Sequence, residues 1–456
     1  MPDRRVFAAV TAALAALWLA ACANVAERPR SADPFAEIAP AYVKLVLRVG
    51  EHEDGYVDAY YGPPEWQAEA KVNKGTVAEL EAEAERLIAA VEAVPPGRLS
   101  ALSRQRKAFL AAHLKAVRYR LDMIEGRRDP FLVEAEALFG VRPHLEPLSF
   151  YDPVLERLER TLPGVGPLAE RMEAWRAKYV IPKERLLAVM EAGIAECRRR
   201  TRQHIRLPAS EAFTLEFVTG KSWSGYNWYK GQAQSLIQVN TDLPIYISRA
   251  LDLGCHEGYP GHHAHNVLLE DRLVRGQGFV EFSVYPLFSP LSLIAEGTSN
   301  YGVDLAFPDE EKLNFEREVL YPLAGLDPST AAALSAMNAA VKDLAGARMT
   351  ISADYLDGRI DRETAIALMQ KYQLVSRARA EQLITFTDNY RTYVINYGLG
   401  EEMARRYVRN QAYDPARRWR VMERVLSRPT LPGDLLKLGP EPRDAPRPAP
   451  TDAVDR

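Results

Sequence analysis

Cysteines and long apolar runs are both scarce in this chain of 456 residues. Its three cysteines, Cys22, Cys197 and Cys255, are too few for a disulfide scaffold or for a cysteine-rich structural zinc site. The apolar run near the N-terminus, residues 6–21, has 16 residues, whereas a helix needs about 20 to cross a bilayer. We therefore do not expect this run to be a permanent membrane span.

An excess of charge of one sign is also missing. The chain has 58 Lys and Arg against 61 Asp and Glu, a net charge of −3, and its basic residues are spread along its length. A nucleic-acid partner would require a concentrated basic face, so none is expected. There is no internal repeat, and the length allows one large domain or two ordinary ones.

The first residues resemble a bacterial lipoprotein signal. Arg4 and Arg5 precede the apolar run, which ends in Leu19-Ala20-Ala21-Cys22, similar to the lipobox in which the cysteine is lipidated and becomes the new N-terminus. The resemblance implies a signal peptide over 1–21 and a lipid on Cys22 that anchors the protein to a membrane surface. Ala23 in place of Asp resembles the pattern that directs Gram-negative lipoproteins to the outer membrane, facing the periplasm. The alternative is a soluble secreted protein that is cut near Ala23.

The rest of the chain divides into three parts by composition. Residues 22–35 are predicted to be a flexible tether, and residues 439–456, rich in Pro and charge, a disordered tail. Residues 36–438 are predicted to form a single large domain in which helical periodicity dominates. The clearest helical pattern covers 76–94, and similar patterns cover 99–124, 183–200, 313–320, 329–343, 363–372 and 378–396.

One region of the domain departs from helical periodicity. Residues 213–218 and 235–240 have the character of strands, and a connection with Gly and Trp, 220–231, lies between them. We therefore predict a mainly α fold with a small antiparallel sheet just ahead of a histidine cluster. This layout resembles the zincin-like helical domain of zinc-dependent peptidases. An edge strand there could hold an extended substrate by backbone hydrogen bonds. The aromatic residues of the connection could line a cleft or simply pack: Trp223, Tyr226, Trp228 and Tyr229.

Four of the eight histidines fall between His256 and His265. Neutral imidazole is a common zinc ligand, and a catalytic zinc ion usually has three protein ligands and a water molecule. The sequence departs from the helical motif H-E-x-x-H, because Pro260 stands where the second histidine would be. On an unbroken helix, His262 would be rotated by about 240° from His256, and His263 would lie about 10.5 Å further along the axis.

Pro260 and Gly261 are therefore predicted to break or bulge this helix, because Pro lacks an N–H and Gly tolerates conformations that other residues avoid. Two residues inserted at a bulge would let His262 take the place of the second histidine of the motif. His262 is favoured over His263 as the second ligand, and the choice between them stays open.

The segment His256-Glu257-Gly258-Tyr259-Pro260-Gly261-His262-His263 resembles the HE-x-x-PGHH signature of the bacterial DUF885 family. That family is similar to zinc metallopeptidases of the gluzincin type, in which a glutamate on a following helix is the third ligand. The resemblance implies that Glu296 has this role here. Glu296 lies in the segment 295–301, which resembles the family's EGWALYAE segment, with Thr298 where Trp is usual.

The resemblance extends over most of the domain. Residues 395–400 resemble the family's LSYKIG segment, with Gly398 in place of Lys, and residues 58–64 resemble one branch of the family. His265 stands where the common form has Gln. The domain at 36–438 is thus expected to be a DUF885-like metallohydrolase.

The resemblance and the spacing together imply one zinc ion held by His256, His262 and Glu296, with a position left for water. Glu257 would act as the general base, and Tyr397 would donate a hydrogen bond to the oxyanion. Glu296 could instead be an ordinary helix carboxylate, and Tyr397 a core residue. Contacts to the ligands or to the substrate are predicted for His263, His265, Asn300 and Asp304.

The function implied is the zinc-dependent hydrolysis of peptide or other amide bonds by a lipid-anchored protein of the bacterial envelope. The alternative is a non-catalytic lipoprotein that binds metal or peptide. Glu257 favours the enzyme, because a pure binder has no need for a base beside its ligand.

Cys197 and Cys255 remain once Cys22 is assigned to lipidation. In an exported protein they could form a disulfide. Alternatively, Cys255, which directly precedes His256, could be a buried thiol packed under the metal site.

Overall fold

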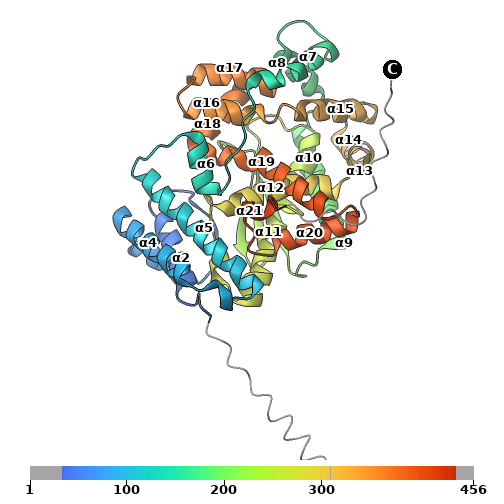
Figure 1. The fold of residues 1–456 in the computed structure, drawn as a ribbon. Coiled ribbons are helices and arrows are strands. Elements are labelled where there is room, and N and C mark those ends of the chain that lie inside the picture. The colour runs from blue at the N-terminus through green and yellow to red at the C-terminus, as the bar shows by residue number, and fades with distance from the viewer. Residues whose placement is uncertain (1–32, 309, 438–456) are drawn as a thin grey trace, which may run out of the picture.

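The computed structural model describes residues 33–308 and 310–437 (Figure 1). The predicted signal peptide, the predicted tail and most of the predicted tether lie outside the described residues. The described part is mainly helical, which confirms the predicted fold class. Phe35 is fully buried, and Asp33 accepts hydrogen bonds from Arg106 at 2.7 and 2.8 Å. The last residues assigned to the tether therefore belong to the packed domain.

The N-terminal helices pack around a hydrophobic cluster that also includes residues from later in the chain, such as Leu293 and Ile395. The predicted helix at 76–94 is confirmed, and it begins at a capping box in which Thr76 and Glu79 bond each other's backbone N–H groups. Its apolar stripe, including Leu80 and Leu87, is buried in the cluster. These helices are α2 (Ile38–Gly50), α3 (Pro64–Val72), α4 (Val77–Ala93), α5 (Ala101–Ile124) and α6 (Phe131–Phe139).

A second group of helices forms the upper part of the molecule in Figure 1. They share a cluster in which Ile351, Ile366 and Ile384 are buried. These helices are α7 (Asp152–Thr161), α8 (Leu168–Arg176), α15 (Ala331–Lys342), α16 (Ala347–Leu356), α17 (Arg362–Gln373) and α18 (Arg377–Tyr390).

The remaining helices form the centre of the domain, around a third cluster that includes Ile194, Leu251 and Leu268. Across the described ranges, no helix has both the length and the apolarity needed to cross a membrane. The central helices are α9 (Leu186–His204), α10 (Ser248–Leu253), α11 (His262–Leu269), α12 (Pro290–Ala306), α13 (Glu310–Phe315), α14 (Tyr321–Ala324), α19 (Ile395–Gln411), α20 (Pro415–Leu426) and α21 (Pro432–Leu435).

The prediction of one helix over 378–396 is wrong. α18 ends at Tyr390, and Arg391 has a positive φ of 50° before α19 begins at Ile395. The Arg391 guanidinium forms an ion pair with the buried carboxylate of Glu134 on α6. The helix therefore breaks at a residue that contacts a distant helix, although the apolar periodicity of the sequence continues through this point.

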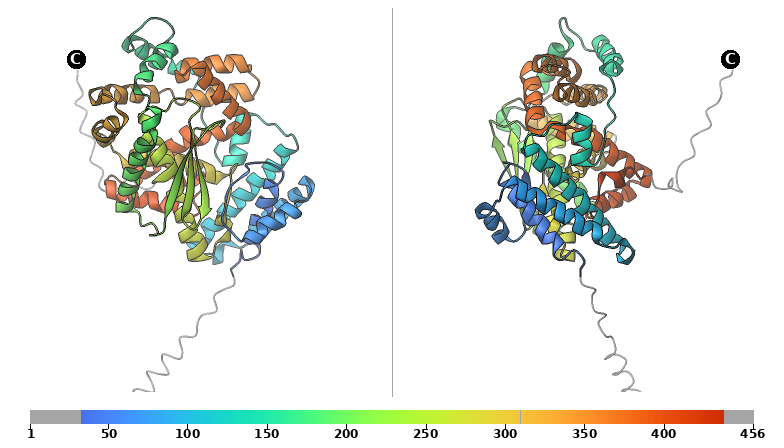
Figure 2. Two further views of the ribbon diagram at one scale, coloured as in Figure 1. Left: turned by 180° about the vertical axis from the view of Figure 1, so that it is seen from behind. Right: turned by 60° about the vertical axis from the view of Figure 1, so that its left-hand side comes forward.

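The predicted sheet exists, but it is mixed rather than antiparallel. It contains β2 (Ala212–Val218), β3 (Gly225–Gly231) and β4 (Gln234–Asn240) in the order β2-β4-β3, and it is seen on the rear face in Figure 2. β3 and β4 form a hairpin, with Gln232 and Ala233 at positive φ in the turn, whereas β2 pairs with β4 in parallel. β3 lies inside the predicted connection. Because this strand begins and ends with glycine, its sequence looks like a loop. A further antiparallel pair joins β1 (Val57–Tyr60) and β5 (Val284–Pro286).

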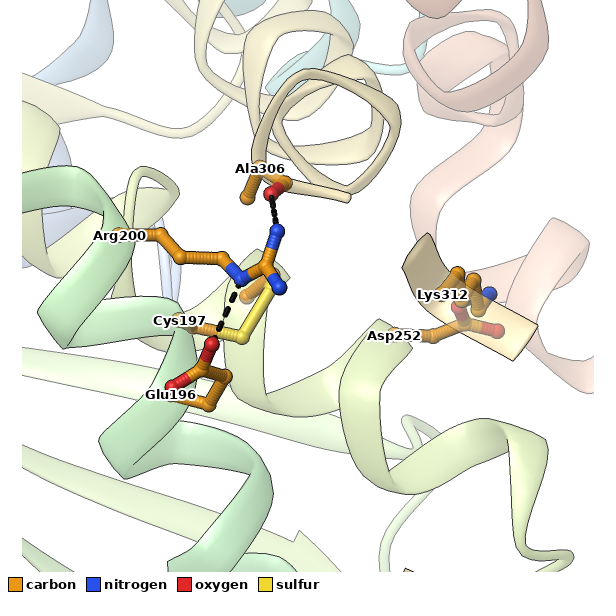
Figure 3. Close-up of a disulfide and its surroundings, with 7 residues drawn as sticks. Glu196, Cys197, Arg200, Asp252, Ala306 and Lys312 are labelled. Carbon is orange, nitrogen blue, oxygen red and sulfur yellow. Dashed lines mark hydrogen bonds and ion pairs between the residues drawn. A yellow bond between two sulfur atoms is a disulfide. The ribbon is translucent and has the colours of Figure 1, made fainter. Parts of the chain in front are cut away.

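Cys197 and Cys255 form a disulfide, with their Cα atoms 5.4 Å apart. Both are fully buried, and the bond joins α9 to the segment that carries His256 (Figure 3). Arg200, which follows on α9, donates to the backbone oxygen of Ala306 at the end of α12 at 3.0 Å. α9 is therefore tied to the segment that carries His256 and to the helix that carries Glu296.

Candidate metal centre

The histidine segment lies where one helix ends and the next begins. α10 passes directly into a π-helical turn, Gly254–Gly258, which carries the first histidine of the cluster. The chain then becomes extended at Tyr259, whose peptide bond to Pro260 is cis, and α11 starts at His262. The predicted break at Pro260 and Gly261 is confirmed.

Gly261 permits this break through a very close backbone contact. A Cβ at this position would lie 1.8 Å from the backbone oxygen of His256, so a side chain could not be accommodated. The Gly261 N–H donates to the backbone oxygen of Cys255 at 3.0 Å. Because the chain folds back here, the Nε2 atoms of His256 and His262 are only 3.1 Å apart.

Glu296 on α12 meets both of these imidazoles. Its carboxylate lies 3.2 Å from Nε2 of His256 and 3.7 Å from Nε2 of His262. Ligand atoms about 2.1 Å from a tetrahedral zinc ion are about 3.4 Å apart. Apart from these histidines, the buried Oε2 of Glu296 has no hydrogen-bond partner in the described chain. The three side chains therefore fit a metal ion.

A second carboxylate is close to the same imidazoles. His256, Glu257 and His262 offer ligand atoms that lie within 4.8 Å of one another. The Glu257 carboxylate is 4.0 Å from Nε2 of His256, whereas that of Glu296 is 3.2 Å away. Glu296 is thus the better placed third ligand, and Glu257 stays available for proton transfer.

Asn300 orients the first histidine. Its amide oxygen lies 2.9 Å from Nδ1 of His256. Because an amide oxygen only accepts hydrogen bonds, Nδ1 carries the proton and Nε2 presents its lone pair to the site. Asp304, one turn further along α12, instead accepts a hydrogen bond from Arg405 at 2.8 Å at the edge of the site.

The two carboxyl groups have opposite pKa shifts. Although burial raises the pKa of Glu296, His262 and His256 hold it well below its ordinary range, so this group stays ionised. Burial raises the pKa of Glu257 to about 7, with a smaller contribution from Glu296 and an opposing one from His262. Such a pKa suits a group that accepts and returns a proton near neutral pH.

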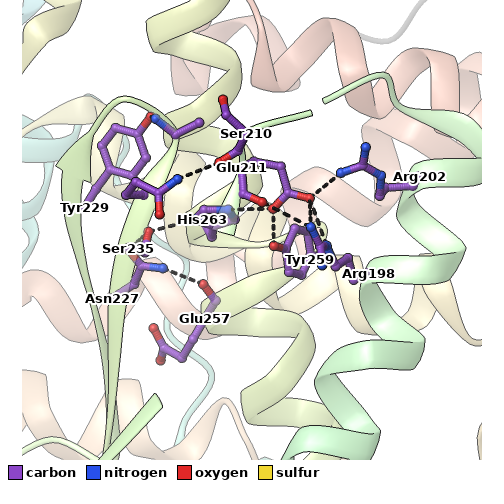
Figure 4. Close-up of polar contacts among 12 residues, drawn as sticks. Arg198, Arg202, Ser210, Glu211, Asn227, Tyr229, Ser235, Glu257, Tyr259 and His263 are labelled. Atoms are coloured by element: carbon purple, nitrogen blue, oxygen red, sulfur yellow. Dashed lines mark hydrogen bonds and ion pairs between the residues drawn. The ribbon is translucent and has the colours of Figure 1, made fainter. Parts of the chain in front are cut away.

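His263 points away from this cluster, into a buried polar network (Figure 4). Its Nε2 lies 3.2 Å from the Glu211 carboxylate, and its Nδ1 lies 2.7 Å from the Ser235 hydroxyl. Since both ring nitrogens are engaged, the second ligand position falls to His262.

The same network fixes the backbone of Glu257. Ser235 on β4 donates to the amide oxygen of Asn227 on β3 at 3.1 Å, and the Asn227 amide donates to the backbone oxygen of Glu257 at 2.7 Å (Figure 4). Glu211, Asn227 and Ser235 could not be identified from the sequence, because strand positions and a loop carboxylate have no distinctive spacing. Only the alternation along β3 and β4 could have hinted that the two strand residues face inward.

Two tyrosines lie beside Glu296. Tyr393, which the sequence reasoning missed, donates to Oε1 of Glu296 at 2.8 Å. Tyr397, the predicted oxyanion donor, lines the same cleft, and its ring centroid is 6.0 Å from that of Tyr393. Burial, followed by the charge of Glu296, raises the pKa of Tyr397, so its hydroxyl keeps its proton. The four-residue spacing between the tyrosines is the signal that could have identified Tyr393.

Asp58 and His265 are also ionisable groups near the site. Asp58 on β1 lines the cleft and accepts a hydrogen bond from Tyr226, and burial raises its pKa to about 6. The family resemblance at residues 58–64 includes Asp58 but does not predict a role for it. His265 is buried on α11, and burial lowers its pKa to about 3, so it is neutral.

The candidate ligands lie in the wall of a cleft of about 1310 Å³. Residues from β3, α10, α12, α16, α18 and α19 line it. Its size is sufficient for several residues of a peptide.

No family model matches this chain, and no curated protein matches it. One similar solved structure is a "putative lipoprotein" from Colwellia psychrerythraea, with 15% identity and a TM-score of 0.49, covering 81% of this chain and 70% of that chain. Another is an M32 carboxypeptidase from Deinococcus radiodurans R1, with 14% identity and a TM-score of 0.31, covering 88% of this chain and 96% of that chain. Neither similarity is close enough to support a function, so the resemblance to the DUF885 family rests on the sequence motifs.

Proposed function

We propose that this protein is a zinc-dependent hydrolase of peptide or other amide bonds, anchored to the bacterial envelope by a lipid on Cys22. The observation that carries the proposal is the meeting of His256, His262 and Glu296 in one cleft, with Glu257 beside them. A protein that only binds metal needs the ligands but not the adjacent carboxyl group.

Each group has a role in hydrolysis. A zinc ion bound there would act as a Lewis acid and lower the pKa of water to about 7. Glu257 takes up a proton from the attacking water molecule and later gives it to the leaving amine. Asn227 holds the backbone of Glu257, which keeps the carboxyl group in place during both transfers.

Tyr393 and Tyr397 have two further roles in the proposed reaction. Tyr393 fixes the orientation of Glu296 through their hydrogen bond. Tyr397 keeps its proton and is therefore able to donate to the oxygen that becomes negative in the transition state.

The edge strand β3 supports an extended peptide as the substrate. β3 is the last strand of its sheet, and residues 225–227 line the cleft. A Cβ on Gly225 would lie 2.8 Å from Oε1 of Glu257, so the strand backbone runs directly past the proposed base. A peptide that adds to this edge by backbone hydrogen bonds would bring a carbonyl group close to Glu257.

The disulfide supports the proposed location. Disulfides persist in oxidising compartments such as the bacterial periplasm and are rare in the cytosol. The bond between Cys197 and Cys255 is therefore what an exported protein would contain.

The test is Glu257→Gln in zinc-loaded protein, assayed on a defined mixture of peptides. We expect the variant to keep its zinc and to lose at least about 100-fold in rate. Glu316→Gln is a matched control, because Glu316 lines the same cleft and burial also raises its pKa to about 7. A Glu257→Gln protein that hydrolyses at the wild-type rate, or a wild-type protein that cleaves nothing, would favour the metal- or peptide-binding lipoprotein.

A further inference from the structure

Two arginines in the cleft lack an acidic partner in the described residues. Among the described residues, the charged or aromatic contacts of Arg348 on α16 are with the rings of Phe386 and Tyr397, at 5.3 and 5.6 Å from their centroids. Its Nε is buried and has no hydrogen-bond partner in this part of the chain. Arg379 on α18 donates to the neutral side chains of Gln382 and Ser224. In the described part of the chain, neither positive charge is thus paired with a carboxylate.

The two arginines line the same cleft as a third, Arg249. The charges of Arg249 and Arg348 act together with burial to lower the pKa of Arg379 to about 10. Burial likewise lowers the pKa of Arg348. Arg249 has only a loose ion pair, 3.7 Å from Asp252, whose carboxylate lies 2.6 Å from Lys312. Gathering like charges away from water is unfavourable unless an anion joins them.

Within the described residues, no acidic side chain of the cleft forms an ion pair with Arg348 or Arg379. Asp304 and Glu401 form ion pairs with Arg405, and Asp252 is closest to Lys312. Among the described residues, Arg405 and Lys312 of the cleft thus have acidic partners, whereas Arg348 and Arg379 have none.

The unmatched arginines adjoin the proposed reaction centre. Tyr397 lies against Arg348, and the charges of Glu296 and Glu257 both act on its hydroxyl. An anion held by Arg348 would therefore lie about one side chain from the metal ligands.

We propose that Arg348 and Arg379, flanked by Arg249, form a subsite for a carboxylate of the substrate, carried by the residue next to the scissile bond. This inference rests on the proposed hydrolase. Guanidinium groups bind carboxylates with two parallel hydrogen bonds, which gives both strength and orientation. The carboxylate is either a free C-terminus, which makes the protein a carboxypeptidase, or an acidic side chain.

The test compares three forms of one N-acetylated tetrapeptide: the free acid, the C-terminal amide, and the amide with Glu as its last residue. Their kcat/KM values are measured with zinc-loaded protein, and their Kd values by calorimetry with the Glu257→Gln variant. We expect a carboxylate-bearing form to exceed the neutral amide by at least about tenfold in both measurements. A preference for the free acid identifies the terminal carboxylate, and a preference for the Glu-containing amide identifies the side chain.

The Arg348→Gln/Arg379→Gln variant should lose this preference while keeping its zinc content. Its Tm should not fall, because no ion pair with an acid is removed. Arg405→Gln is the matched control: it changes an arginine of the same cleft that is already paired with Asp304, and it should retain the preference.

Equal values for the three peptides, or a preference that survives in the double variant, would overturn the subsite. Hydrolysis without any preference would refute the subsite alone. A binding preference in the absence of hydrolysis would support the subsite and refute the hydrolase.

Discussion

Gly297 of α12 lies directly against Gly400 of α19: a Cβ on Gly297 would be 2.3 Å from the backbone carbonyl of Gly400. This contact lets the two helices approach each other where one carries Glu296 and the other follows Tyr393. The two segments that resemble a known family at 295–301 and 395–400 therefore meet in space at a pair of glycines.

Gly297→Ala is expected to lower the free energy of unfolding by about 1–3 kcal/mol, because the added methyl group meets backbone atoms that must shift. Denaturant unfolding measures this change. Gly398→Ala is the control on the facing helix, since its Cβ would have no atom within 4 Å, and it should be neutral or up to about 1 kcal/mol more stable. Equal stability of the two variants would show that the close contact is not formed.

Loss of the disulfide should destabilise the domain. Replacing Cys197 and Cys255 by Ala is expected to cost about 2–4 kcal/mol, since the bond closes a loop with a sequence separation of 58. Because both cysteines are buried, reductant should act on the wild type only as it unfolds. Unfolding curves with and without reductant provide the measurement, and the double variant should be insensitive to reductant. A wild-type protein that is equally insensitive would contradict the bond.

Glu211 should make the protein sensitive to acid. Burial opposes ionisation, but hydrogen bonds from His263, Tyr259 and Arg198 lower the pKa of Glu211 to about 2. Its contribution to stability is therefore complete above about pH 4.5, the unfolded value, and is lost as the pH falls toward 2. Glu211→Gln should cost about 3 kcal/mol at pH 7 and flatten the loss of stability between these pH values.

The control for Glu211 is Glu363→Gln. Glu363 forms an exposed ion pair with Arg377, so its replacement should cost less than about 1 kcal/mol. Stability measured by denaturant at several pH values tests both variants. An unchanged acid transition in Glu211→Gln would mean that this carboxylate is not held by the network.

Asn300 should matter for metal affinity although it is not itself a ligand. Asn300→Ala removes the partner of Nδ1 of His256 and should weaken zinc binding about 10–100-fold in competition with a chelator. Asp304→Asn, on the same helix but paired with Arg405, should leave the zinc affinity unchanged. The reverse order of effects would assign the orienting role to Asp304.

The sequence predicted the features that depend on local pattern. Helical periodicity identified α4 and α5 closely, and the Pro260-Gly261 pair predicted the break that brings His256 and His262 together. Helix geometry also predicted that Asn300, which follows Glu296 by four residues, would lie near it.

The features that depend on distant contacts were not predictable in this way. Arg391 ends α18 while it is paired with Glu134, more than two hundred residues away. β2 pairs with β4 in parallel because β3 lies between them in the sequence and forms a hairpin with β4. The segment that forms β3 was predicted to be a connection. That Arg348 has no acidic partner among the described residues likewise depends on its surroundings in the fold and not on its neighbours in the sequence.

Zinc content after metal removal and reloading tests the metal centre most directly. We predict one zinc ion per chain in the wild type and in His144→Ala, an exposed histidine far from the cluster in sequence. We predict loss of the bound zinc in His256→Ala, His262→Ala and Glu296→Ala, because each removes one of the three ligands. One zinc ion retained in all three variants, or none bound by the wild type, would contradict the proposed centre.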